Sequence, residues 1–460
     1  MNKRDFRLFT AALLFALLAP ALPLYALELT VDEAVDYALK NGKNLKAAAI
    51  ELEIKKRESD TSWNALLPSV QASASLVRSN EVHNSFKNVA DMLNPLYTFH
   101  GIPPVTVPEP LEKDYWKAVG NIGITLNFNA ALVNEIRASR ADYEAGFILW
   151  EQALRETERN IRKMFYGLLL QSEDLKLQET TLINAENRLK QAEIRYKNGL
   201  APELALLQAQ AAYENQKPEV LKAKHALKRQ FDLFIFLLGL PSDTVIELKG
   251  TIEPVFVDID AERLIADCSN RRFDLASLNK NLELMRLRLL SMNLQSYTPS
   301  LSLNYTWQPV VTDIGKDWFK DKNVIDNGSF SASLVWNITD TLPFSQNRIR
   351  TRSLNDNIRK AEIQYEAVVQ KAENEIRSLA DSLNQRRLLI EAGKGNIELA
   401  QKTYDMTLEA YRTGTVRLSD VRDAETRLNQ AELGLAAEKY NYLCDLLDLE
   451  YALNTNLCNF

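Results

Sequence analysis

Residues 300–308 read Ser300-Leu-Ser-Leu-Asn-Tyr-Thr-Trp-Gln308, a strict alternation of polar and apolar side chains. Alternate side chains of a β-strand point to opposite faces, so one face of this strand is apolar and aromatic and the other is polar without charge. A strand of about ten residues with these two faces is typical of a tilted membrane-crossing strand. The alternative is a soluble sheet, whose wet face normally carries Lys, Glu or Asp.

Three further stretches show the same alternation, and the four expected strands cover about 69–78, 120–129, 299–309 and 328–338. Four strands cannot close a membrane barrel, because the smallest barrels have about eight. In lipid an open sheet edge leaves backbone groups unpaired, at several kcal/mol each. If these strands enter the membrane, several chains must share one barrel, and three chains would supply about twelve strands.

Outside the strands, apolar residues recur at every seventh position in two long series that end at Tyr196 and Tyr411. Each member of the second series lies 215 positions after its partner in the first. Seven-residue spacing predicts long helices that wind around their neighbours. A Tyr-x-x-Gly turn closes each series, at Gly199 and Gly414, and the register resumes beyond it. The sequence therefore predicts a long helical hairpin in each half.

This repeat divides the chain into a first unit over 27–248 and a second over 249–460, each with one hairpin and two strands. The predicted fold is mainly α with a small transmembrane β part. Segments 80–118 and 312–327 join the strands of each pair and are expected to be loops on the outer rim. Pro218 lies inside the return helix of the first unit and is expected to kink or break it.

Residues 1–26 are typical of a secretory signal peptide, with basic Lys3 and Arg4 before a short apolar run. No later stretch holds eighteen apolar residues in a row, so no membrane-spanning helix is predicted. The chain has 55 basic and 61 acidic residues, a net charge of −6, which argues against a nucleic-acid partner.

Three cysteines do not make a disulfide framework, and Cys444 and Cys458 could pair or stay free. The three histidines are scattered, without a cysteine or carboxylate cluster beside them, so no metal site is expected. Neither a nucleophile–base arrangement nor a nucleotide loop is evident. We therefore expect no enzyme and no cofactor.

Three short motifs resemble the TolC family of outer-membrane efflux proteins: Leu29-Thr-Val-Asp-Glu-Ala-Val35, Ala65-Leu-Leu-Pro-Ser69 and Tyr297-Thr-Pro-Ser-Leu301. With the two Tyr-x-x-Gly turns, the resemblance covers essentially all of the chain after residue 26. It implies a homotrimer whose helical hairpins form a helical barrel in the periplasm, continued by a shared twelve-stranded barrel in the outer membrane.

The resemblance also implies a passive exit duct of a tripartite efflux or type I secretion system. A periplasmic adaptor and an inner-membrane RND or ABC transporter would be its partners. Two other classes remain open from the residues alone: a periplasmic adaptor protein and a structural coiled-coil protein of the envelope. Adaptors usually have one helical hairpin and lipoyl-like strands, whereas this chain has two hairpins and serine-rich alternating strands.

The family's periplasmic entrance lies at the tip of the helical barrel, and several residues match it here. Asp420 and Asp423 match acidic ring positions, and their spacing of three puts both carboxylates on one helix face. Two ordinary solvated aspartates at a helix N-terminus are the alternative. Tyr411 matches the gating tyrosine, and Tyr196 is its counterpart in the first repeat.

The two turns depart from the family pattern. Arg417 lies one residue beyond the usual arginine position, which is Val416 here, and Ala205 stands where the family often has aspartate. We therefore expect a gate built mainly from the second turn, with bond partners different from those of the best-known members.

Overall fold

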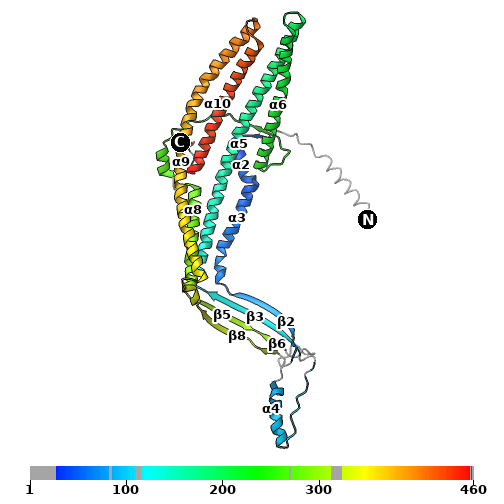
Figure 1. Cartoon of the computed structure of the whole chain (residues 1–460), viewed down its shortest axis with the longest axis vertical. Helices are drawn as coiled ribbons and strands as arrows, with labels where there is room; N and C mark the ends of the chain where they lie inside the picture. Colours follow the sequence, from blue (N-terminus) through cyan, green and yellow to red (C-terminus); the bar gives the residue numbers. More distant parts are fainter. Residues whose placement is uncertain are drawn as a thin grey trace, which may run out of the picture. The chain divides into compact units, whose positions relative to one another are not determined.

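The computed structural model describes residues 27–81, 85–109, 111, 115–268, 271–311, 324–455 and 457 (Figure 1). The expected signal peptide, Cys458 and most of the loop 312–327 lie outside these residues. Two compact units divide the chain. Met1–Glu53, Gly146–Ser277 and Tyr365–Phe460 form the first, here called the hairpin unit; Ile54–Ala145 and Leu278–Gln364 form the second, here called the sheet unit.

Two helical hairpins account for nearly half of the chain. Helix α5 (Leu132–Lys197, 66 residues) is followed by α6 (Glu203–Leu238, 36 residues), and α9 (Gln346–Arg412, 67 residues) by α10 (Leu418–Leu453, 36 residues). Gly199 and Gly414 lie in the turns with φ of 68° and 84°, a left-handed conformation that glycine adopts without strain. The predicted fold class, mainly helical with a small β part, is confirmed.

The remaining helices are shorter. They are α2 (Val31–Asn41), α3 (Lys43–Asp60), α4 (Ser85–Phe99), α7 (Ala261–Cys268) and α8 (Phe273–Tyr297), with short 3-10 turns at Ser62–Leu66 and Ile338–Thr341. Among the residues that the structure describes, no helix has an apolar stretch long enough to cross a membrane.

Helix α6 continues through Pro218, so the expected break at this proline is wrong. A proline inside a helix costs about 3 kcal/mol, because one backbone hydrogen bond is lost and the ring crowds the preceding turn. Buried residues lie on both sides of it, Ala209 before and Phe234 after. We infer that packing along the helix outweighs the local cost.

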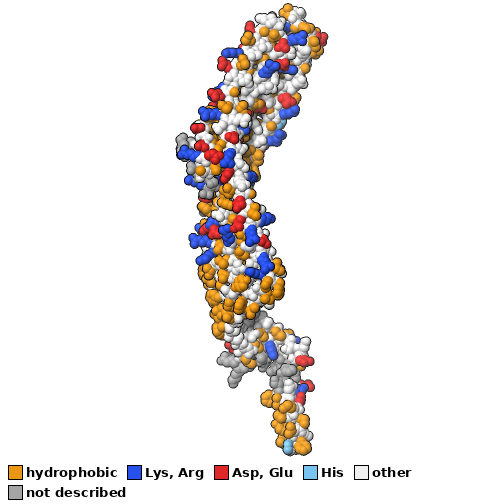
Figure 2. All heavy atoms as spheres, turned by 60° about the vertical axis from the view of Figure 1, so that its left-hand side comes forward, with side chains coloured by type: hydrophobic (Ala, Val, Ile, Leu, Met, Phe, Trp, Pro, Cys, Tyr) orange, Lys and Arg blue, Asp and Glu red, His pale blue; other side chains and the backbone are white. Residues whose placement is uncertain are grey.

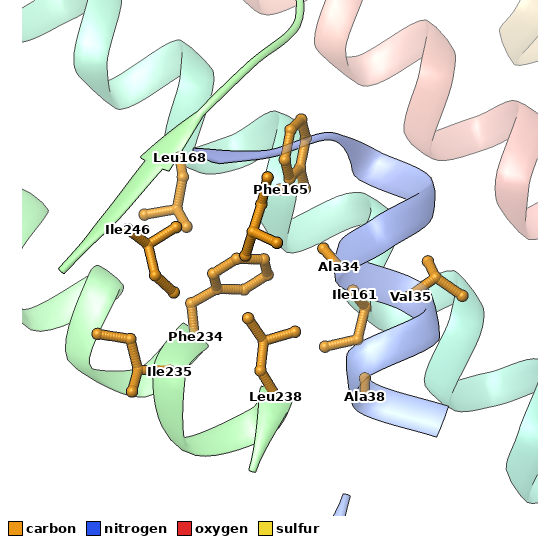
Figure 3. Packing of buried hydrophobic residues seen from close by; sticks show 11 residues of the cluster. Ala34, Val35, Ala38, Ile161, Phe165, Leu168, Phe234, Ile235, Leu238 and Ile246 are labelled. Atoms are coloured by element: carbon orange, nitrogen blue, oxygen red, sulfur yellow. The ribbon is translucent and has the colours of Figure 1, made fainter. Parts of the chain in front are cut away.

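The main core of the hairpin unit joins the N-terminal segment to the first hairpin (Figure 3). Phe165 of α5 and Phe234 of α6 are almost completely buried, with ring centroids 6.4 Å apart. Residues of α2 pack against them, together with Leu29 of β1 (Leu27–Leu29) and Ile246 of β4 (Ile246–Leu248). These two short strands pair in parallel and were not predicted, because three residues are too few to show a period.

The first of the three family motifs, residues 29–35, contains the residues that cap the start of α2. The Thr30 backbone N–H donates to the Glu33 carboxylate at 2.8 Å, and the Glu33 N–H donates to the Thr30 hydroxyl at 3.4 Å. This reciprocal arrangement satisfies two backbone donors that a helix N-terminus otherwise leaves open. It fixes the direction in which α2 enters the core.

A second core holds the other hairpin together. Ile376, Leu383 and Ile390 of α9 are each 1% exposed and pack against Tyr442 and Leu449 of α10. All five belong to the seven-residue series, so that series marks the buried side of these helices. The Tyr442 hydroxyl accepts a hydrogen bond from the Val257 N–H at 3.1 Å, which fastens the connecting segment to the hairpin.

The sheet unit contains one antiparallel sheet in the order β7-β6-β3-β5-β8, with β2 paired to β3. The long strands are β2 (Ser69–Arg78), β3 (Trp116–Phe128), β5 (Ser300–Trp307) and β8 (Ser329–Val335). They correspond to the four expected strands, although β3 begins four residues earlier than 120. Two three-residue strands, β6 (Pro309–Val311) and β7 (Val324–Asp326), extend the second pair.

The segment 80–118 is not simply a loop, which corrects the sequence interpretation. It contains α4, a helix of 15 residues with Pro95 inside it, and the first residues of β3. Its prolines suggested an irregular segment, but Pro95 lies in the second half of α4 and most of the others follow the helix. The helix is therefore compatible with a proline-rich composition.

Candidate functional site

The strands of the sheet unit present an exposed apolar face. On β5 and β8, Leu301 lies opposite Leu334 and Tyr305 opposite Phe330. The side chains of Phe330 and Leu334 are each 70% exposed. Figure 2 shows a band of the surface where hydrophobic side chains gather and charged side chains are few. An apolar patch of this kind marks a surface that does not face water in the working protein.

On β5 and β8 the other face is polar and carries no charge. Ser302 lies opposite Ser333, and Asn304 opposite Ser331. Among the described strands, β2 pairs only with β3 and β8 only with β5, so each end of this part of the sheet has an open edge. Such edges are templates for pairing with another chain.

The two helical turns of the hairpin unit place the expected gate residues unequally. Tyr411 on α9 lies beneath the guanidinium of Arg195 on α5, 5.6 Å from ring centroid to Cζ. This is a contact between a cation and an aromatic face. Tyr196, the counterpart of Tyr411, is 41% exposed. Near the first turn, the residue that contacts Tyr411 is therefore Arg195. The sequence interpretation did not predict this contact.

Asp420 and Arg417 come together at the start of α10. The Arg417 backbone N–H donates to the Asp420 carboxylate at 2.9 Å, and the Ser419 hydroxyl donates to the other oxygen at 3.3 Å. Asp420 thus caps its helix. Asp420 and Asp423 are exposed, whereas Val421 and Ala424 are buried, so both carboxylates lie on the solvent side of α10. This position is compatible with a ring of carboxylates in an assembly.

A buried ion pair joins the two hairpins near these turns. Arg188 of α5 donates from Nη2 to Oε2 of Glu425 of α10 at 2.6 Å, and the two side chains are 12% and 5% exposed. The second carboxylate oxygen accepts from Asn184 Nδ2 at 2.8 Å. Both oxygens of Glu425 therefore have a partner, which a buried carboxylate requires.

Further polar contacts extend this pair along the helices. Asn429 of α10 donates to the Thr181 hydroxyl of α5 at 2.9 Å. Burial and the nearby Glu425 carboxylate raise the pKa of the Tyr404 hydroxyl. We call these contacts the inter-hairpin row; its members are Thr181, Asn184, Arg188 and Arg195 on α5, and Tyr411, Glu425 and Asn429 on α9 and α10.

The inter-hairpin row was not predicted from the sequence, although the position of Glu425 could have indicated it. Glu425 lies four residues after Val421 and three before Leu428, which both belong to the apolar series. A carboxylate on the apolar side of a helix needs a buried partner. This pattern predicts that Glu425 has a buried partner. It does not identify that partner as Arg188, which lies 237 positions before Glu425 in the sequence.

Cys444 was expected either to pair with Cys458 or to stay free, and Cys458 lies outside the described residues. The Cys444 thiol is partly buried in α10, and this burial raises its pKa. A protonated thiol is a poor nucleophile and a poor metal ligand.

Comparison with known proteins identifies the relatives of this fold. The sequence pattern described as "Outer membrane efflux protein" matches residues 34–239 and 292–455. The chain is 22% identical over 449 residues to a probable outer membrane lipoprotein, SilC, of Salmonella typhimurium, covering 93% of this chain and 84% of that protein. It is 36% identical over 80 residues to the outer membrane protein TolC of Salmonella enteritidis, a match that spans only 16% of TolC.

Solved structures show the same fold. The Campylobacter jejuni outer membrane channel CmeC superposes with a TM-score of 0.75 at 18% identity, covering 92% of this chain and 85% of that one. CusC superposes with a TM-score of 0.69 at 18% identity, covering 92% and 91%. The family pattern spans both hairpins and most of the sheet unit. The chain therefore belongs to the outer membrane efflux protein family, whose members are channels rather than enzymes, and it is a protein of the cell outer membrane.

Proposed function

We propose that this chain is one subunit of a homotrimeric exit duct that conducts substrates passively from an inner-membrane pump to the cell exterior. The observation that carries the proposal is the sheet with an apolar outer face, a polar inner face on which Lys117 of β3 is a rare charge, and open edges. Such a sheet is stable in lipid only when other copies complete a closed barrel. Three copies of the four long strands give about twelve, enough for a water-filled pore.

The helical hairpins support the remainder of the proposal. Their turns, at Gly199 and Gly414, form the end of the duct that faces the periplasm. There a periplasmic adaptor and an inner-membrane RND or ABC transporter would dock and supply the energy. The inter-hairpin row holds the two hairpins of one subunit together near this end, and we assign it the role of keeping the entrance narrow.

The assembly can be tested directly. Purified outer membrane should contain the chain as a heat-resistant trimer, visible as a band of about three times the monomer mass when samples are loaded without boiling. Reconstituted trimers should conduct ions across planar lipid bilayers. A monomer recovered from the soluble periplasmic fraction would exclude the proposal.

The acidic positions at the second turn should make the entrance prefer cations. Replacing Asp420 and Asp423 together by asparagine keeps an acceptor for the Arg417 N–H and removes two charges from each subunit, or about six from a trimer. The ratio of cation to anion permeability, measured from reversal potentials under a salt gradient, should fall severalfold. Glu409→Gln is the matched control, because Glu409 lies near the same turn with 66% of its side chain exposed. Equal ratios in wild type and the double variant would exclude an acidic ring.

A further inference from the structure

Helix α4 has an apolar side that nothing in its own unit covers. Val89, Met92, Leu96 and Phe99 are 51%, 72%, 57% and 85% exposed. At about 100° per residue, these four side chains occupy an arc of about 80° on the helix. The space-filling view shows hydrophobic side chains gathered over this part of the sheet unit (Figure 2).

The opposite side of α4 is already occupied by its own chain. Asn94 holds the segment that follows the helix: its Nδ2 donates to the Val105 carbonyl at 3.0 Å, and the Val105 N–H donates to Asn94 Oδ1 at 2.7 Å. The Ile102 N–H bonds to the Tyr97 carbonyl at 2.8 Å and ends the helix. Helix and returning segment thus form one element with a fixed covered side and a fixed open side.

The topology puts α4 beside the boundary between subunits. The strands before and after it are antiparallel, and Arg78 at the end of β2 lies opposite Trp116 at the start of β3. The segment therefore leaves and returns at the same end of the sheet, opposite to the end at which β3 leads into α5. β2 also carries an open edge, the edge that another copy must pair with in the proposed barrel. α4 therefore follows in the chain a strand that lies at the proposed interface.

The charges near this side favour another copy of the chain over a lipid surface. Helices that lie on membranes usually carry several Lys or Arg residues on the polar side. Between Ser85 and Val105 the acidic and basic side chains are Lys87 and Asp91, which balance each other. An apolar stripe on a nearly neutral helix suits packing against an identical stripe.

The dimensions also agree. A barrel of about twelve strands spaced about 4.8 Å apart and tilted by about 40° has a backbone diameter of about 24 Å. Three helices of about 10 Å diameter, packed side by side around one axis, fill a circle of about 22 Å. α4 has 15 residues and would therefore extend about 22 Å along that axis.

We propose that the three α4 helices of one trimer pack through Val89, Met92, Leu96 and Phe99 and close the external mouth of the duct. This rests on the proposed function, since it needs three copies around one barrel. Closure at the outer end would limit the entry of external solutes while the pump is idle. The helix would move aside when substrate is driven outward.

Cysteine cross-linking in the full-length protein tests the packing. In a variant whose native cysteines are replaced by alanine, Met92→Cys places three thiols close to the common axis, and oxidation should join two of three subunits in most trimers. Asp91→Cys, about 100° away around α4, is the matched control and should give at least five times less dimer. Trimers that form but cross-link equally at both positions would overturn the inference and leave the proposed function standing. Absence of trimers would instead remove the proposed function.

Two further measurements complete the test. Met92→Asp places three like charges at the packed stripe and should raise the single-channel conductance at least twofold. Unchanged conductance would overturn the proposed closure of the external mouth.

The second measurement is fluorescence quenching. The emission of a fluorophore attached at Met92→Cys should not be quenched by spin-labelled lipid. Strong quenching would mean that α4 lies on the membrane and would also overturn the inference.

Discussion

Replacing Phe330 by arginine is expected to abolish assembly of the chain in the outer membrane, whereas the same replacement at the neighbouring Ser331 is expected to preserve it. The two residues are adjacent on β8 and point to opposite faces of the sheet. Phe330 lies opposite Tyr305 on the apolar face, and Ser331 lies opposite Asn304 on the polar face. Both positions are exposed, so neither arginine disturbs a packed core.

The expected size of the difference follows from the cost of a charge in lipid. An arginine on the lipid face near the bilayer midplane costs about 2–4 kcal/mol, and a trimer contains three of them. The total of about 6–12 kcal/mol is comparable to the whole stability of many domains. An arginine on the polar face remains in contact with water inside the duct and changes only the local field.

Membrane fractionation and unboiled gels measure the outcome. Phe330→Arg should yield little or no heat-resistant trimer. Ser331→Arg should yield normal amounts of trimer with altered ion selectivity, because three positive charges then line the pore. Equal trimer yields from the two variants would show that the apolar face of β8 does not lie in lipid.

This prediction depends on a feature that was readable from the sequence, and the reason is geometric. A strand of seven or more residues shows its period of two directly, as in β5 and β8. The seven-residue series likewise identified Ile376, Leu383 and Tyr442, which are buried in the second core. Periodic patterns report which side chains share a face, and in α9 and α10 that face is buried.

Other features carried no such pattern. β1, β4, β6 and β7 have three residues each, too few to show alternation. Helix α4 was not predicted, because the prolines in and after it indicated an irregular segment. At the candidate site, the resemblance to the TolC family pointed to Asp420 and Tyr411. It could not supply Arg188 or Arg195 as partners, because their contacts depend on how one hairpin packs against the other.

Glu425→Leu is expected to loosen the contact between the two hairpins and to open the periplasmic end of the proposed duct. The substitution leaves Arg188, whose side chain is 12% exposed, without its carboxylate. Breaking a buried ion pair on one side costs about 3–5 kcal/mol, because the remaining charge stays buried. Since a factor of ten corresponds to about 1.4 kcal/mol, the locally opened form should become at least about 100-fold more populated.

Limited digestion of folded trimers with proteinase K at the hairpin turns measures that population when opening is fast relative to cleavage. Two controls separate the charge effect from a general weakening. Glu409→Leu removes an exposed carboxylate that pairs with Arg412, and it should change the cleavage rate little, since such pairs contribute about 0–1 kcal/mol.

The second control is the double variant Arg188→Met with Glu425→Leu, which replaces the pair by apolar side chains and should recover most of the protection. Conductance decides what the charges contribute to function. If the inter-hairpin row only stabilises the contact between the hairpins, the double variant will have the same conductance as wild type. If the polarity of the pair sets the width of the entrance, the double variant will be stable yet differ in conductance. Equal cleavage of Glu425→Leu and Glu409→Leu would exclude Glu425 as a link between the hairpins.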